Sequence, residues 1–340
     1  MKQQAMKSFK LSVAIMIAAV MLLLAACGSG GESGSGASTN GAPANGASQS
    51  AASEEPSTGA ATGNSADAKT TAYPLTVKDA SGTEITFDKA PERVVSLVPS
   101  ETETLFAIGA GDEVVGVDEY SNYPEEASKK TKIGDLKTNV EAVTALNPDL
   151  VVASSTMNAE AIEKLRQLNI KVYASAPKTY DETVDKIGQL GLIMNKQEQS
   201  GQVQQHMKDV KQQVTDAVKD APKTKVYLEF SPGWTVGKGE FMDELVTLAG
   251  GTNVAGDQSG WFEVNSEQIV KANPELIVYP KLDGNPILPG IKSRAGWSVI
   301  DAVKNNRFAE VPMDPLVRVG PRLADGLLDL AKAIHPDLVK

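Results

Sequence analysis

The chain has 340 residues, of which 41% are hydrophobic and 22% are charged, a composition typical of a globular protein with one or two domains. The first 26 residues carry three lysines and no acid, so the rest of the chain keeps 30 of the 33 basic residues against 43 acidic ones, a formal charge of −13. This acidity argues against a nucleic-acid-binding function, and a single cysteine excludes an internal disulfide.

The N-terminus has the pattern of a secretion signal. Three lysines precede an apolar run at residues 11–26, which is too short for a stable membrane span but fits the apolar region of a signal peptide. The run ends in Leu24-Ala25-Ala26-Cys27, which resembles a bacterial lipobox, where cleavage before the cysteine leaves a thiol that carries diacylglycerol. We therefore interpret residues 1–26 as a lipoprotein signal peptide and Cys27 as a lipid anchor on the extracytoplasmic face of the cell membrane. The alternative is an ordinary secretory signal with an incidental cysteine.

Residues 27–72 are predicted to form a flexible, lipid-anchored tether. They are mostly Gly, Ser, Ala, Asn and Thr, with almost no large apolar residue that could offset the entropy of ordering the chain. A flexible segment of this length spans on the order of 35 to 40 Å, enough for a folded head to move above a membrane.

The folded part is predicted to begin near Tyr73, where two alternating runs around residues 79–82 indicate a β-hairpin. A short apolar run predicts a strand at 94–98, and Ser100 with Glu103 has the spacing of a capping box for the helix that follows. Helices and strands then alternate as in a parallel sheet covered by helices. The predicted helices are 102–108, 140–146, 159–168 and 181–194, and the further strands are 114–117, 150–153 and 171–174.

A long amphipathic helix is predicted at Lys196–Ala221, because apolar residues recur there at helical spacing and the other faces are Gln, Lys and Asp. Twenty-six helical residues would run roughly 39 Å, more than a local crossover needs. The apolar positions are Val203, Met207, Val210, Val214, Ala217 and Val218.

The segments on either side of this helix contain a repeat. Residues 139–152 (NVEAVTALNPDLVV) align without a gap with residues 265–278 (NSEQIVKANPELIV), and Asn, Glu, Asn and Pro keep their places. The sequence therefore predicts an α/β protein with two similar α/β lobes joined by a single long helix. The predicted boundaries are 73–195 for the N-terminal lobe, 196–221 for the linking helix and 222–340 for the C-terminal lobe.

The second lobe shows its own alternation of strands and helices. A helix at 241–249 is closed by two glycines, and the repeat helix starts at Ser266. The other predicted elements are strands at 225–230, 276–279 and 308–311 and helices at 298–305 and 323–334.

Five stretches resemble the cobalamin and iron-siderophore substrate-binding proteins of ABC importers. They are residues 93–109 (RVVSLVPSETETLFAIG), 120–124 (YSNYP), 139–152, 237–239 (GKG) and 320–323 (GPRL). The resemblance covers about residues 73–336. It implies two α/β lobes bridged by a long helix, a ligand cleft between them, and a monomer that delivers its ligand to a permease dimer.

Within that family the sequence looks closest to the cobalamin binders. The resemblance then implies that Trp234 and Trp261 contact the corrin ring. Both tryptophans are predicted to lie in glycine-flanked loops that follow strands, and loops at such edges are where open α/β folds bind ligands. The other interpretation makes each a core residue under a loop. The residues that the resemblance places along the rest of the cleft are Tyr120, Asp314, Pro315, Leu316, Val317 and Arg318.

Two departures and one rival ligand accompany this interpretation. Leu136 and Ser154-Ser155 stand in regions where the enteric cobalamin binder carries tryptophans, so one wall would be less aromatic. A ferric siderophore is the alternative ligand, because such ligands are typically bound by Arg and Tyr, and Arg318, Arg322 and Tyr120 could do this.

Catalytic and metal-binding functions have little support. His206 and His335 are isolated and no histidine cluster exists, so a zinc, manganese or haem-ligating site is not expected. The motifs of a nucleophile elbow, a zinc protease, a phosphate-binding loop and a dinucleotide-binding turn are all missing. An enzyme and a structural adhesive lipoprotein are the alternatives from other classes.

The repeated glutamates, Glu141 and Glu267, stand near the N-terminus of a predicted helix in each lobe. Thr138 and Glu141 have the spacing of a capping box, but Val264, at the matching place in the second repeat, cannot cap. In the family that the chain resembles, one glutamate on each lobe meets arginines of the two permease subunits. We therefore expect both glutamates to be exposed on the same outer side and to dock the protein on its permease.

Overall fold

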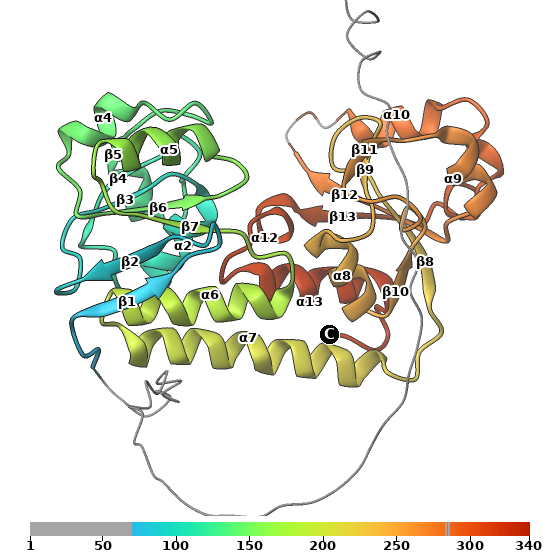
Figure 1. The fold of residues 1–340 in the computed structure, drawn as a ribbon. Coiled ribbons are helices and arrows are strands. Elements are labelled where there is room, and N and C mark those ends of the chain that lie inside the picture. The colour runs from blue at the N-terminus through green and yellow to red at the C-terminus, as the bar shows by residue number, and fades with distance from the viewer. Residues whose placement is uncertain (1–69, 283, 285) are drawn as a thin grey trace, which may run out of the picture. The chain divides into compact units, whose positions relative to one another are not determined.

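The computed structural model describes residues 70–340 except 283 and 285 (Figure 1). The predicted signal peptide, Cys27 and nearly all of the predicted tether lie outside the described residues. Contacts with the folded part are already present slightly before Tyr73, because Thr71 donates from its backbone N to Asn195 Oδ1 at 2.8 Å and from its hydroxyl to Leu192 O at 2.7 Å. Within residues 70–340, no helix has the length and apolar character needed to cross a membrane.

The N-terminal lobe contains a five-stranded parallel sheet in the order β5-β4-β3-β6-β7. Apart from the polar edge strand at Thr131–Lys132, its strands are short, apolar and almost wholly buried, as expected where helices cover both faces. The predicted hairpin is present as β1 and β2, which pair in antiparallel fashion. The strands are β1 (Leu75–Lys78), β2 (Glu84–Phe87), β3 (Val94–Ser96), β4 (Val114–Val117), β5 (Thr131–Lys132), β6 (Leu150–Ser154) and β7 (Val172–Ser175). The helices are α2 (Pro99–Ala107), α3 (Glu125–Ser128), α4 (Val140–Ala145), α5 (Ala159–Gln167) and α6 (Tyr180–Ile193).

The C-terminal lobe has a four-stranded parallel sheet in the order β10-β8-β12-β13 and a separate antiparallel pair, β9 with β11. Its strands are β8 (Thr224–Leu228), β9 (Trp234–Val236), β10 (Gly251–Asn253), β11 (Trp261–Glu263), β12 (Leu276–Lys281) and β13 (Phe308–Pro312). Its helices are α8 (Phe241–Leu248), α9 (Ser266–Ala272), α10 (Ile287–Ser293), α11 (Asp301–Lys304), α12 (Met313–Val317), α13 (Leu323–Ile334) and a short 3-10 turn at Trp297–Val299. The predicted α/β class with parallel sheets is thus confirmed.

The two lobes share one topology. In each, the chain builds outward from a first strand, β3 or β8, and then returns to add β6 or β12 on the other side of that strand. The strand order therefore reverses between β3 and β6 in one lobe and between β8 and β12 in the other. In both lobes the repeated segment forms the helix and strand at this reversal, α4 with β6 and α9 with β12. Ligands of open α/β sheets bind beyond the carboxyl ends of the strands at such a point.

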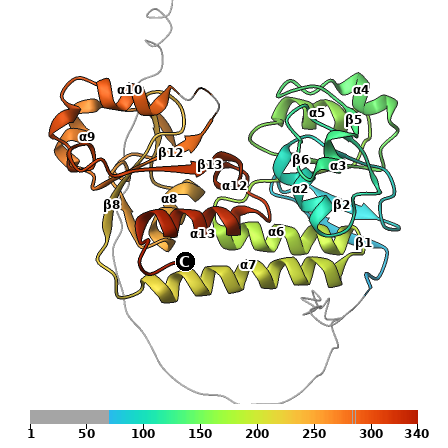
Figure 2. The ribbon, with the colours of Figure 1, turned by 180° about the vertical axis from the view of Figure 1, so that it is seen from behind.

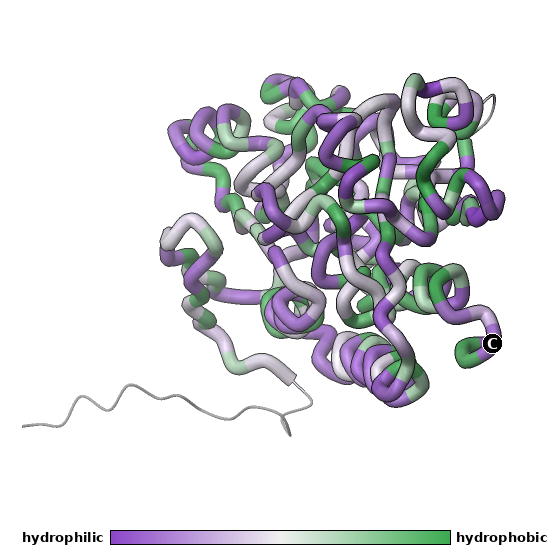
Figure 3. Tube along the Cα trace, turned by 90° about the vertical axis from the view of Figure 1, so that its right-hand side faces the viewer, coloured by the Kyte–Doolittle hydropathy of each residue, from purple (hydrophilic) through white to green (hydrophobic). Residues whose placement is uncertain are grey.

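Helix α7 (Gln197–Val218) runs beneath both sheets and links the lobes (Figures 1 and 2). It has 22 residues and ends three residues before the predicted Ala221. Met207, Val210, Val214 and Val218 are buried on its inner side, and it packs against α6 of one lobe and α13 of the other. One continuous hydrophobic cluster contains residues of both lobes and of α7. The helices at the bottom of Figure 3 carry both hydrophobic and hydrophilic residues, as amphipathic helices should.

Both predicted capping boxes are wrong. Helix α2 starts at Pro99 after an uncapped Val98, so Ser100 and Glu103 lie inside the helix. Helix α4 is capped by Asn139, whose side chain accepts from Ala142 N at 3.0 Å, and not by Thr138. Asn265 caps α9 in the same way. The repeated asparagine therefore supplies the cap in both lobes, and the glutamate two residues later is not needed for it.

We predict that Gly191→Ala lowers the free energy of unfolding by about 1–3 kcal/mol, because overpacking at a tight helix contact is destabilising. A Cβ at Gly191 on α6 would overlap the Oγ and Cβ of Ser200 on α7. Gly201→Ala is the matched control, since nothing lies within 4 Å of its added Cβ, and it should leave stability unchanged or raise it by up to about 1 kcal/mol. Urea unfolding followed by circular dichroism measures both. Equal midpoints for the two variants would contradict the tight α6–α7 contact.

Candidate ligand-binding site

We call the loops and helix starts that follow the carboxyl ends of the parallel strands the carboxyl edge of each lobe. Tyr120 follows β4 on the carboxyl edge of the N-terminal lobe. On the C-terminal lobe, Trp234 comes after β8, Trp261 after β10 and residues 314–318 after β13. All segments predicted to bind ligand therefore belong to the carboxyl edges, where the topology favours a ligand.

The two carboxyl edges meet through a cluster of charged side chains, Glu103, Asp314, Arg318 and Arg322, which we call the interlobe charge cluster. Glu103 of α2 accepts from Arg318 Nη1 at 2.7 Å and from Arg322 Nε and Nη2 at 2.9 and 2.6 Å. Asp314 lies 2.9 Å from Arg318 Nη2 and 3.7 Å from Arg322 Nη2. The formal charges of the four side chains in the interlobe charge cluster sum to zero.

The burial of this cluster explains its multiple bonds. The Glu103 side chain is only 2% exposed, and a carboxylate removed from water requires charged partners. Burial by itself would lower the pKa of Arg322, but the hydrogen bond to Glu103 and the charges of Glu103 and Asp314 outweigh it and raise that pKa above its usual value. Both arginines are already paired with carboxylates of this cluster.

Tyr120 lies beside this cluster on a loop that buried side chains hold in place. Arg318 Nη2 donates to Tyr120 O at 3.4 Å, so the structure brings these two predicted residues together. The backbone N of Tyr120 donates to Asp118 Oδ1 at 2.8 Å, and Ser121 Oγ bonds to Asp118 and, at 2.7 Å, to Thr102 Oγ1. These supporting side chains are buried, whereas Tyr120 itself is 53% exposed. The backbone of Tyr120 is thus fixed, and its ring is available to a ligand.

Trp234 and Trp261 lie on paired strands and not in loops, which corrects the sequence-based placement. Trp261 pairs with Val236 and Trp234 with Glu263 in the β9–β11 pair, so the two tryptophans are diagonal neighbours on the same face. They are 44% and 43% exposed, whereas Trp297 is fully buried. Their exposure excludes the interpretation as core residues and leaves two aromatic side chains free to contact a ligand.

Exposed hydrophobic side chains gather on the carboxyl edges. Most of the large hydrophobic residues that are exposed in the described part of the chain follow the carboxyl end of a parallel strand by one to eight residues. They are Tyr120, Tyr123, Leu136, Met157, Trp234, Trp261 and Leu282. Clustered exposed apolar surface marks a binding site. Sequence reasoning missed Tyr123, Met157 and Leu282, although their position just after predicted strands was a usable signal.

Two residues predicted to line the cleft are buried instead. Pro315 and Leu316 lie inside α12, and Leu316 packs in the core cluster that both lobes share. The carbonyl oxygen of Pro315 is so close to α13 that a Cβ on Gly326 would lie 2.5 Å from it. The helical turn thus directs these two residues inward, and Asp314, Val317 and Arg318 remain as the partly exposed candidates.

A cavity of about 350 Å³ borders the interlobe charge cluster on the side of α7. Glu103, Tyr123 and Arg322 line it together with His206 of α7. The Arg322 guanidinium carbon lies 4.1 Å from the centroid of the Tyr123 ring. The charge cluster is therefore reachable for small polar groups.

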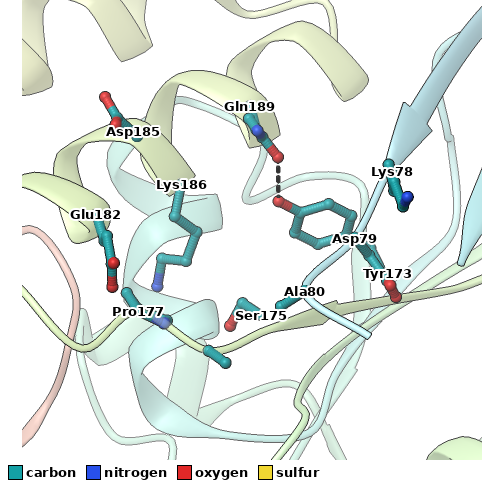
Figure 4. Close-up of a pocket in the computed structure, with 11 residues that line it drawn as sticks. Lys78, Asp79, Ala80, Tyr173, Ser175, Pro177, Glu182, Asp185, Lys186 and Gln189 are labelled. Carbon is teal, nitrogen blue, oxygen red and sulfur yellow. Dashed lines mark hydrogen bonds between the residues drawn. The ribbon is translucent and has the colours of Figure 1, made fainter. Parts of the chain in front are cut away.

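A second cavity, of about 280 Å³, lies beyond the carboxyl end of β7 (Figure 4). Tyr173 donates its hydroxyl to Gln189 Oε1 at 2.6 Å on one side of it. Lys186 reaches it from α6 and donates to Glu101 Oε1 at 2.9 Å and to Val319 O at 2.7 Å. None of the residues predicted to bind ligand lines this cavity, and its buried lysine is already paired, so we do not assign the ligand site to it.

Glu141 and Glu267 occupy equivalent places in the two lobes. Each is the second residue of its helix, α4 or α9, and each is exposed. Both helices lie on the parts of their lobes away from α7 (Figures 1 and 2). Among the described residues, no group of three or more His, Cys, Asp or Glu could hold a metal ion.

Comparison with known proteins gives consistent matches. The model of the periplasmic binding protein family matches residues 94–315. A Bacillus subtilis protein named as an uncharacterised ABC transporter substrate-binding lipoprotein is 38% identical over 83% of this chain and 94% of its own length. The crystal structure of a possible iron-binding, periplasmic solute-binding protein of Staphylococcus epidermidis has a TM-score of 0.65 and 30% identity and covers 73% of this chain and 100% of its own. That of the periplasmic vitamin B12-binding protein of Vibrio cholerae has a TM-score of 0.65 and 29% identity and covers 72% of this chain and 97% of its own.

Proposed function

Because this chain belongs to the periplasmic binding protein family, we propose that it binds a corrinoid such as cobalamin between its carboxyl edges and delivers it to the permease of an ABC importer. Proteins of this family are non-enzymatic components of transport systems. The chain is accordingly a substrate-binding protein of the group that serves cobalamin and iron-chelate importers.

The observation that carries the corrinoid assignment is the pair of exposed tryptophans on one face of the β9–β11 pair. Aromatic faces suit a large flat ring, and each aromatic side chain can bury some 150 to 250 Å² against it. Tyr120 and the exposed aliphatic residues of the N-terminal lobe would form the opposing wall. Polar contacts would come from Asp314 and Arg318, which stand at the junction of the two edges.

An iron chelate, as a ferric siderophore or as haem, is the second candidate, and the likeness to the Staphylococcus epidermidis protein favours it. Anionic chelates of this kind are typically bound by arginine. Arg318 and Arg322 are both paired with Glu103 and Asp314 in this chain, which weakens this candidate relative to an uncharged corrinoid.

We predict that Trp234→Ala and Trp261→Ala each weaken binding of cyanocobalamin on the order of tenfold or more, since aromatic anchors dominate such contacts. Both side chains are exposed, so thermal stability should change little. Leu168→Ala is the control, because Leu168 is exposed but precedes β7 and therefore lies at the opposite edge of the sheet. Isothermal titration calorimetry measures the affinities. No heat with any corrinoid, together with micromolar or tighter binding of a ferric siderophore or haem, would transfer the assignment to the second candidate.

We propose further that Cys27 carries the lipid anchor, which is supported by the lipobox-like sequence and by the lipoprotein name of the Bacillus subtilis relative. The Cys27→Ala protein should then lose the mass of the lipid and leave the membrane fraction. Intact-mass spectrometry and membrane fractionation measure this. A Cys27→Ala protein that still partitions with membranes would leave the incidental-cysteine interpretation standing.

Glu141 and Glu267 are proposed to dock the protein on the permease by charge pairing, one from each lobe. Three observations support this: both are exposed, both occupy the second position of the repeated helix, and neither is needed for capping, because Asn139 and Asn265 serve there. A charge on each lobe suits a partner with two equivalent subunits.

We predict that Glu141→Ala or Glu267→Ala slows ligand uptake roughly three- to tenfold, that the double variant slows it further, and that ligand affinity stays unchanged. Glu198→Ala is the matched control, because Glu198 is also exposed and is also the second residue of a helix, α7. Any loss of helix-dipole stabilisation is then common to all three variants. Uptake of labelled ligand by cells or vesicles is the measurement. Normal uptake by the double variant would limit the two glutamates to a local role at the helix ends.

A further inference from the structure

The interlobe charge cluster contains two arginines but offers no net positive charge. Arg318 and Arg322 both come from the C-terminal lobe, and both bond to Glu103 of the N-terminal lobe at 2.6 to 2.9 Å. With Asp314 included, two cations face two anions. Glu103 thus takes up hydrogen-bond donors that would otherwise be free at the junction of the two carboxyl edges.

Two neighbouring guanidinium groups are well suited to bind an anion. Their planar donor sets match carboxylate and other paired anionic oxygens, and such bonds are among the strongest in proteins. Arg318 also contacts Tyr120 and Asn122 of the opposite lobe, so the donors lie where the two carboxyl edges meet. The Glu103 carboxylate therefore occupies the place that an anionic group of a ligand would take.

The geometry points to Glu103 as the residue that sets the charge class of the ligand: by pairing with Arg318 and Arg322 it makes the site accept uncharged ligands and reject anionic ones. This inference rests on the proposed function only in placing the ligand between the carboxyl edges, and not on the ligand being a corrinoid.

The rejection of anions follows from the burial of Glu103. An anionic ligand that took over the arginines would leave a buried carboxylate without partners, which is strongly unfavourable. An anionic ligand that bound beside the intact cluster would gain nothing from arginines already paired and would be repelled by Glu103 and Asp314. An uncharged ligand meets neither obstacle, since the cluster stays intact beneath it.

The test compares two iron complexes that differ mainly in charge. Ferric iron with three catecholates carries a net charge of about −3, whereas ferric iron with three hydroxamates is close to neutral, by the charges of the groups themselves. Glu103→Gln keeps the shape of the side chain and gives the cluster one net positive charge. We expect the variant to bind the tricatecholate complex on the order of tenfold more tightly than the native protein, with little change for the trihydroxamate complex. The gain should shrink as ionic strength rises.

A double variant separates charge from loosened packing. Glu103→Gln combined with Arg322→Gln leaves Arg318 with Asp314 and restores a neutral cluster, so the gain for the tricatecholate complex should disappear. Asp79→Asn is the matched control, since Asp79 is a buried acid paired with Arg166 within the N-terminal lobe, and it should not alter the preference between the complexes. If Glu103→Gln does not fold, Asp314→Asn removes one repelling carboxylate on a more exposed side chain, and it should give a smaller gain because Glu103 still pairs with both arginines; a tenfold gain with Glu103 in place would overturn its role.

Fluorescence titration of the full chain with each complex and with cyanocobalamin distinguishes the possible failures. Tight binding of the tricatecholate complex by the native protein, or a gain that persists in the double variant, overturns the role of Glu103. The native protein could instead fail to bind cyanocobalamin but bind the trihydroxamate complex more tightly than the tricatecholate complex. This result would support the role of Glu103 and refute the corrinoid assignment.

Discussion

The Glu103 carboxylate needs partners that its own lobe does not provide, and this requirement ties the two lobes together. It lies within α2, almost without contact with water, and its three hydrogen bonds from side chains come from Arg318 and Arg322, more than 200 residues later in the chain. A buried charge that lost these partners would destabilise the protein, so the contact restricts separation of the carboxyl edges. The loops that carry Tyr120 and the segment after β13 are thereby fixed relative to each other.

The same restriction acts from the opposite side of the protein. Helix α7 packs against α6 of one lobe and α13 of the other, and the hydrophobic cluster runs through all three. Apolar burial on this scale disfavours any large relative movement of the lobes, because such movement would expose the cluster to water. With these two constraints, the proposed ligand site would rely on side chains that stay in place, and not on a large closure of the lobes. A prepositioned set of charges and aromatic groups can discriminate among ligands without the entropic cost of ordering them on binding.

The sequence predicted the secondary structure well where periodicity decides it. The alternation of apolar runs and amphipathic helices identified both sheets, and the repeat identified their common topology. The prediction failed where the same residue spacing is compatible with a helix cap and with a long-range contact. Ser100 and Glu103 have the spacing of a capping box, but the glutamate serves a contact 215 residues away in the sequence, to Arg318, that no local pattern reveals. Pro315 and Leu316 failed for a related reason, since the direction of a short helical turn depends on what packs behind it.

The positions of the two tryptophans also depend on a long-range contact that the sequence pattern does not reveal. Their position after predicted strands indicated a ligand site, but only the pairing of β9 with β11 puts both on one face, because strand register decides which side chains share a face. A displacement of one residue would have placed them on opposite faces. Sequence spacing alone could not determine this register, since β9 and β11 are separated by α8 and β10.

The repeat contains asparagines that the fold requires and glutamates that it does not require. Asn139 and Asn265 cap the two repeated helices, and Asn147 and Asn273 adopt left-handed backbone conformations with φ of 46° and 51°, which asparagine tolerates better than most residues. Each repeated asparagine thus has a structural cause within its own lobe. The repeated glutamates make only the modest favourable interaction of an exposed carboxylate with a helix N-terminus. Replacing either glutamate with another residue would therefore cost little stability. The proposed docking on a partner with two equivalent subunits would account for their recurrence at the same place in both lobes.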